Sequence, residues 1–84
     1  MQYVVLRSDL WKEQGWPLGS LAAQAAHAAT AALWLSRETE ETKSYCSPEA
    51  IDGMTKVVLE ADNESTLREL AESLTRAGIA HKLW

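Results

Sequence analysis

The sequence has few of the residues that form cross-links or hold metals. Cys46 is the only cysteine among the 84 residues, so no disulfide can form within the chain. His27 and His81 are the only histidines, and their spacing does not match a zinc site. Cys46 lies in a polar stretch with no histidine near it in sequence, which argues against a cysteine nucleophile. We therefore expect neither a metal nor another cofactor.

Long apolar runs are also missing. No run approaches the ~20 residues that a membrane-spanning helix needs. Met1 leads directly into a strand-like segment, without the basic stretch of a secretory signal. The hydrophobic share of 46% and the charged share of 24% are typical of an ordinary globular domain. The sequence predicts one domain over residues 1–84, with no membrane partner and a cytoplasmic location.

Positive charge is scarce. The formal net charge is −4, which argues against binding nucleic acid by bulk electrostatics. The charge is uneven, however, because residues 1–37 carry +1 and residues 38–84 carry −5. An anionic partner should therefore meet the N-terminal third of the chain.

The segment 17–37 predicts the central helix, since strong helix formers fill it and Pro17 suits a helix start. At about 100° per residue, one apolar stripe should pack on a sheet. This stripe consists of Leu18, Leu21, Ala25, Ala28, Ala29, Ala32 and Leu35. A second row beside it carries the polar side chains of the helix middle, and consists of Ser20, Gln24, His27, Ala31 and Trp34. We expect function on this second row.

Strands and helices alternate in the rest of the chain. Apolar, β-favouring runs predict strands at residues 2–7, 56–61 and 80–84. A helix is expected between the cap Asn63 and Gly78, and a short helical turn between Ser47 and Gly53. Residues 7–16 are expected to form a loop, and residues 38–43 a solvated helix end or loop. The predicted class is α/β in the order β-α-α-β-α-β, with a mixed sheet, the first two strands parallel, and helices packed on the sheet in layers.

Three segments together resemble the type-2 peptidyl-tRNA hydrolase family. The resemblance is closest to its eukaryotic branch, the "peptidyl-tRNA hydrolase domain-containing" proteins. They are Arg7-x-Asp9-Leu10 after the first strand, the Ala-Ala-Gln-x-x-His-Ala signature at residues 22–28, and Lys56-Val57-Val58-Leu59 on the second strand. The resemblance covers the whole chain. It implies an enzyme that cleaves the ester between a peptide and the 3′-terminal ribose of tRNA, with tRNA or peptidyl-tRNA as partner.

Hydrolysis of such an ester needs a general base and hydrogen-bond donors for the oxyanion. The predicted catalytic residues are His27 and Asp9, and the predicted substrate-binding residues are Gln24, Ser20 and Arg7. Each has a structural alternative. His27 is either the base or a buried histidine that ties the helix to the loop after the first strand. Gln24 either contacts substrate or holds that loop, and Asp9 either faces the ligand or makes a turn or cap.

The chain differs from the family pattern in two places. Ser20 stands where the family's hydrolases usually have a lysine, directly after the glycine that opens the helix. The family's last loop, strand and helix would follow Trp84. We therefore expect exposed apolar sheet surface, self-association into a homo-oligomer, and weak or no hydrolysis by these 84 residues. The alternative function is an inactive RNA- or protein-binding module of the same fold.

For three tryptophans the sequence is compatible with two roles. Trp11, Trp16 and Trp34 can either stack on nucleotide bases or serve as packing residues. Packing is the commoner role of isolated tryptophans.

Overall fold

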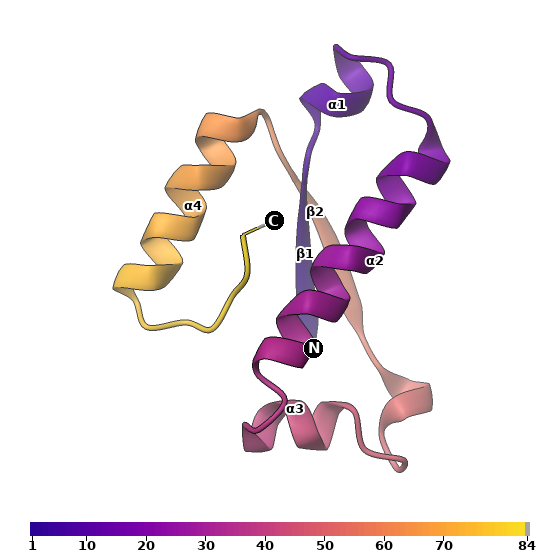
Figure 1. Cartoon of the computed structure of the whole chain (residues 1–84), viewed down its shortest axis with the longest axis vertical. Coiled ribbons are helices and arrows are strands. Elements are labelled where there is room, and N and C mark those ends of the chain that lie inside the picture. Colours follow the sequence, from indigo (N-terminus) through magenta and orange to yellow (C-terminus); the bar gives the residue numbers. More distant parts are fainter. Residues whose placement is uncertain (84) are drawn as a thin grey trace.

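A computed structural model describes residues 1–83 and shows an α/β arrangement of two strands with surrounding helices (Figure 1). The elements, in chain order, are β1 (Gln2–Arg7), α1 (Asp9–Lys12), α2 (Leu18–Leu35), α3 (Glu40–Tyr45), the short 3₁₀ helix η1 (Ile51–Gly53), β2 (Lys56–Ala61) and α4 (Glu64–Arg76). The predicted α/β class is thereby confirmed.

The sheet is the parallel pair of β1 and β2. Its register runs from Gln2 opposite Lys56 to Arg7 opposite Ala61. Both strands coincide with the apolar runs that predicted them, and the parallel pairing is as expected. The strand predicted at residues 80–84 does not form over residues 80–83, which have no regular structure. Trp84 lies outside the described residues. The observed order is therefore β-α-α-β-α, together with the short helices α1 and η1.

One short helix lies where a loop was expected, and another where a solvated helix end or loop was expected. Residues 9–12 form α1, in which Asp9 and Leu10 are buried, and these four residues are too few for a periodic pattern. Residues 40–45 form α3, which begins at the cap Thr39, whose hydroxyl accepts a hydrogen bond from the Thr42 amide. Helices of four and six residues are too short to show a repeating apolar stripe, so hydrophobic periodicity could not detect either element.

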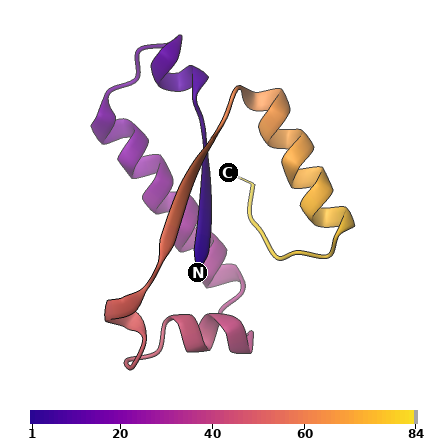
Figure 2. The same cartoon turned by 180° about the vertical axis from the view of Figure 1, so that it is seen from behind.

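The helix α2 lies across the strands and packs along β1 (Figures 1 and 2). The Gln2 side chain donates a 3.0 Å hydrogen bond to the Ala29 carbonyl oxygen. Leu21 is buried. The remaining stripe alanines in the middle of the helix are half-buried, as predicted for a sheet-facing side, and are Ala25, Ala28, Ala29 and Ala32.

The two ends of that stripe do not reach the sheet. Leu18 is 80% exposed and Leu35 is 65% exposed. The 18-residue α2 is about 27 Å long. The 6-residue β1 spans only about 20 Å. The helix therefore extends beyond the strand it covers, and its terminal leucines lie in solvent.

Both ends of α4 are capped as the sequence predicted. The Asn63 side chain accepts a 2.9 Å hydrogen bond from the Thr66 amide at the start of the helix. At its end Gly78 has φ +71°, the left-handed conformation that glycine adopts readily. The Ile79 amide bonds back to the Leu74 carbonyl at 2.9 Å, which completes a Schellman turn. The chain after this turn runs back toward β1 (Figure 1).

The core of the described residues is small. Its buried apolar members are Val4, Leu10, Leu21 and Ala61. On the strands, Tyr3 is 61% exposed, Val58 59% and Leu59 49%, so the expectation of exposed apolar sheet surface is confirmed. None of the helices within residues 1–83 is long and apolar enough to cross a membrane.

Leu21 should carry much of the α2 contact. Replacing it by alanine removes buried methyl groups and leaves a cavity, so Leu21→Ala should lower the free energy of unfolding by about 2–4 kcal/mol. Leu18→Ala, the same change three residues away at an exposed position, should cost under about 0.5 kcal/mol. Urea unfolding followed by circular dichroism measures both. Equal losses in the two variants would mean that α2 does not pack through Leu21.

Candidate functional site

The chain is fixed at the C-terminal end of β1 by Ser8. Its backbone N–H and its hydroxyl both donate to the Ala61 carbonyl oxygen, at 2.7 and 3.2 Å. Ser8 is 2% exposed and Ala61 6%, so water does not compete for this contact. This double hydrogen bond joins the ends of the two strands and thereby sets the position of Asp9, the next residue.

Asp9 forms an ion pair with Arg7. The Arg7 Nη2 lies 2.7 Å from Asp9 Oδ2, and Nε donates to Oδ1 at 3.1 Å, which makes the pair bidentate. The hydrogen bonds from Arg7 lower the pKa of the Asp9 carboxyl below its ordinary value, against an opposing effect of burial. The same hydrogen bond raises the pKa of Arg7. Asp9 is the first residue of α1, and the N-cap is Ser8, so Asp9 does not take the cap position that one alternative expected.

A lowered pKa limits what Asp9 can do chemically. A general base works best when its pKa lies near the working pH, and Asp9 is shifted further away from neutrality. The arrangement suits a fixed negative charge that orients Arg7. Arg7 in turn remains protonated and can present its remaining N–H groups to an anion.

Ser20, Gln24 and His27 lie along one row of α2. Ser20 and His27 are exposed, and Gln24 is half-buried. The expected burial of His27 is therefore wrong. Gln24 is the less exposed of the two. The reason is the position of this row on the helix. The middle of the row lies roughly 120° around the helix axis from the middle of the sheet-facing stripe, and Gln24 is the member of the row nearest to that stripe.

The predicted site residues thus come from two places. Arg7 and Asp9 form a contact pair at the end of β1, whereas the other three positions follow the outer side of α2. Side chains alternate along a strand, and Gln2 points to α2, so Arg7 belongs to the opposite alternation of β1. Among residues 1–83, no three His, Cys, Asp or Glu side chains come together in a group that could hold a metal ion.

The tryptophans divide by exposure. Trp11 and Trp16 are half-buried, whereas Trp34 is 65% exposed. Arg37 stacks on the Trp34 ring with its Cζ 4.3 Å from the ring centroid. Sequence reasoning missed this pair, although a tryptophan and an arginine three residues apart on a helix are placed to meet.

A family model described as "Peptidyl-tRNA hydrolase PTH2" matches residues 1–84. The chain belongs to the peptidyl-tRNA hydrolase PTH2 family. Two curated relatives, each named "Putative peptidyl-tRNA hydrolase PTRHD1", are similar to it over its full length. The relative from Mus musculus is 52% identical and the relative from Homo sapiens 51%. No solved structure matches the chain significantly.

The PTH2 match includes every segment that suggested the resemblance, because it runs over the whole chain. The chain spans 59% of the length of both curated relatives. Its family and its α/β fold are therefore established.

The Arg7–Asp9 pair should make stability depend on acid pH. An unfolded aspartate has a pKa of about 3.9, and the folded pKa of Asp9 is lower. The pair therefore stabilises the fold fully above about pH 4 to 5, and its contribution is lost as the pH falls through the folded pKa. The difference in unfolding midpoint between the wild-type chain and Asp9→Asn should shrink between pH 5 and pH 2.

The matched control for this titration is Asp52→Asn, which removes an exposed carboxylate in η1, before the end of β2 that pairs with Gln2 rather than with Arg7. The unfolding midpoint of this variant should stay close to that of the wild-type chain from pH 5 to pH 2. A difference for Asp9→Asn that remains constant down to pH 2 would contradict the ion pair.

Proposed function

We propose that this protein hydrolyses peptidyl-tRNA, cleaving the ester between the peptide and the 3′-terminal ribose. The observation that carries the proposal is an exposed His27 one turn beyond Gln24 on α2, in a chain that matches the PTH2 family along its whole length. Histidine is the side chain that most often serves as a general base, and exposure gives His27 access to a large substrate.

In the proposed reaction, His27 accepts a proton from water as the water oxygen attacks the ester carbonyl carbon. Gln24 donates a hydrogen bond to the oxygen that becomes negative. The bond between the carbonyl carbon and the ribose 3′-oxygen then breaks, and the proton held by His27 passes to that ribose oxygen. The peptide leaves with a free carboxyl group and the tRNA with a free 3′-hydroxyl.

The start of α2 supplies a place for an anionic group of the substrate. Helix N-termini attract phosphate through their free N–H groups, and Ser20 adds an exposed hydroxyl in the first turn. A Cβ added at Gly19 would meet no atom within 4 Å, so packing does not require a glycine there. Glycine does permit a ligand to approach the backbone closely. In this proposal Arg7, held by Asp9 at the end of β1 and apart from the row on α2, supplies a fixed positive charge to another part of the large substrate.

A second candidate is an RNA-binding module of the same fold without hydrolytic activity. The observation that favours it is Ser20, which lacks the positive charge of the lysine usual in the family's hydrolases. Losing one donor to an oxyanion can cost about 100- to 1,000-fold in rate. We therefore expect slow turnover from these 84 residues, and binding without turnover would identify the second candidate.

The test uses an N-acetylated aminoacyl-tRNA and follows the release of free tRNA under single-turnover conditions. The wild-type chain should release tRNA slowly. His27→Ala should reduce the rate about 100-fold or more, the usual contribution of a general base. Its free energy of unfolding should change by less than about 0.5 kcal/mol, because His27 is exposed.

His81→Ala is the matched control, since His81 is the other histidine and is also exposed. It should leave the rate unchanged. An unaltered rate in His27→Ala would show that the base is elsewhere. If the wild-type chain binds the acylated tRNA but releases none, the second candidate replaces the first.

We also propose that the protein acts in the cytoplasm, where its proposed substrate is made, and that this chain associates with itself. Exposed apolar side chains on paired strands favour association. Val58→Lys should weaken the dimer about tenfold in analytical ultracentrifugation, because it places a charge in the apolar surface. Ser65→Lys makes the same charge addition on exposed α4 and should have no effect. A wild-type chain that is monomeric at 100 µM would refute self-association.

A further inference from the structure

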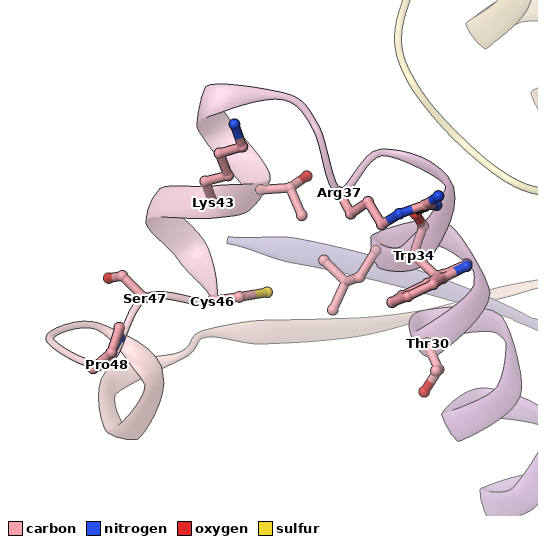
Figure 3. A pocket seen from close by; sticks show the side chains of 9 residues that line it. Thr30, Trp34, Arg37, Lys43, Cys46, Ser47 and Pro48 are labelled. Carbon is pink, nitrogen blue, oxygen red and sulfur yellow. Dashed lines mark hydrogen bonds between the residues drawn. The ribbon is translucent and has the colours of Figure 1, made fainter.

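A hollow of about 560 Å³ lies between the C-terminal end of α2 and α3 (Figure 3). Trp34 and Arg37 come from α2 and the turn after it, and Lys43 and Cys46 from α3 and its end. Figure 3 shows the Cys46 thiol directed toward the Trp34 side of this space. The residues proposed for ester hydrolysis do not line it.

Trp34 is the unusual member of this hollow. A tryptophan exposed to 65% keeps a large apolar ring in water, and sheet packing does not explain it, because α2 extends beyond β1 here. Arg37 covers the ring, and its Nη1 also donates to the Trp34 carbonyl oxygen at 2.8 Å. The indole is thus held by its own helix end while remaining open to a ligand.

Hydroxyl groups fix the walls of the hollow. The Ser36 hydroxyl donates to the Ala32 carbonyl at 2.9 Å and lies 2.9 Å from the Thr42 hydroxyl. The Thr39 hydroxyl bonds to the Ser36 carbonyl and caps α3. These bonds hold α3 against the end of α2, so the space between them is part of the fold.

The charged residues that line the hollow are both positive, Arg37 and Lys43. Glu38 approaches Arg37 at 3.8 Å and Glu40 approaches Lys43 at 4.0 Å. These two glutamates are 83% and 91% exposed, so water and salt screen both pairs and a bound anion can compete for the cations. An aromatic ring beside two cations fits a ligand with a flat base and a phosphate.

The position of Trp34 relates this hollow to the proposed reaction. Trp34 follows His27 by seven residues, which places it about 10 Å further along the helix and only about 20° around it. A strand of RNA whose 3′ end lies at His27 could therefore run along the outer side of α2 and reach Trp34 within a few nucleotides.

We infer that this hollow binds an unpaired nucleotide near the 3′ end of the RNA, with the base stacked on Trp34 and the phosphate beside Arg37 and Lys43. Stacking of bases on aromatic side chains tolerates any base, since every base presents a flat π-face. The inference rests on the proposed RNA substrate for its ligand, but it does not depend on ester cleavage.

The test measures binding of a 5′-fluorescein-labelled, unacylated RNA that ends in single-stranded CCA, by fluorescence anisotropy. Trp34→Ala should weaken binding about tenfold, and Trp34→Tyr, which keeps a ring, should weaken it about threefold or less. Leu35→Ala is the matched control, because Leu35 is also 65% exposed but does not line the hollow. It should bind as the wild-type chain does. Circular dichroism confirms that each variant is folded.

Two further readouts are specific to this mode of binding. The RNA should slow alkylation of Cys46 in the wild-type chain and not in Trp34→Ala, because Cys46 lines the same space. A blunt RNA duplex should bind less tightly than the single strand, since its bases are already stacked. The logarithm of the binding constant should fall linearly with the logarithm of the salt concentration. Lys43→Gln should make this slope shallower by about 0.7, the value expected for one phosphate contact on a single strand.

Trp34→Ala that binds like Leu35→Ala would overturn the inference, as would equal binding of the duplex or no binding of the RNA by the folded wild-type chain. Because the RNA carries no ester, failure here is distinct from failure of the proposed hydrolysis. Trp34-dependent binding without tRNA release would support this inference and exclude the hydrolytic proposal.

Discussion

Parallel pairing of β1 with β2 is the constraint on which the rest of the structure depends. Parallel strands need a crossover from the end of one strand back to the start of the next, and here α2 makes most of that return. A helix longer than the strand has one part that packs and one part that projects. The packed part consists of Leu21 and small alanines, and the alanines let α2 lie close to β1. The projecting part carries Trp34 and forms one wall of the hollow with α3.

Much of the fold follows from local sequence. The apolar runs locate β1 and β2, and Asn63 and Gly78 mark the ends of α4 by chemistry that acts within a few residues. Elements without such signals could not be found. The charged residues of α3 have no apolar stripe, and its start depends on hydroxyl contacts with the end of α2. A short β-favouring run at residues 80–83 is not enough to form a strand, because strands need a pairing partner as well as propensity.

The site was less predictable than the fold, since residue types do not reveal their neighbours. The row through Gln24 and His27 could be placed on α2 from helical periodicity alone. The exposure of each residue depends on which side of the helix faces the sheet. Gln24 lies nearer to that side and is half-buried, whereas His27 lies further from it and is exposed. The bidentate contact of Arg7 with Asp9 requires the Ser8 hydrogen bonds to Ala61, more than fifty residues away in sequence. Such long-range contacts leave no local pattern.

The register of the sheet also has a kinetic consequence. Gln2 pairs with Lys56, a sequence separation of 54 residues, so β1 cannot be paired until most of the chain is available. Contacts between distant residues slow folding because the intervening loop must be closed first. Alanine-rich α2 can form from local contacts and shorten that loop before the strands meet. During synthesis from the N-terminus, β1 therefore emerges from the ribosome well before its partner, and its apolar edge is open to chaperones or to other nascent chains for that interval.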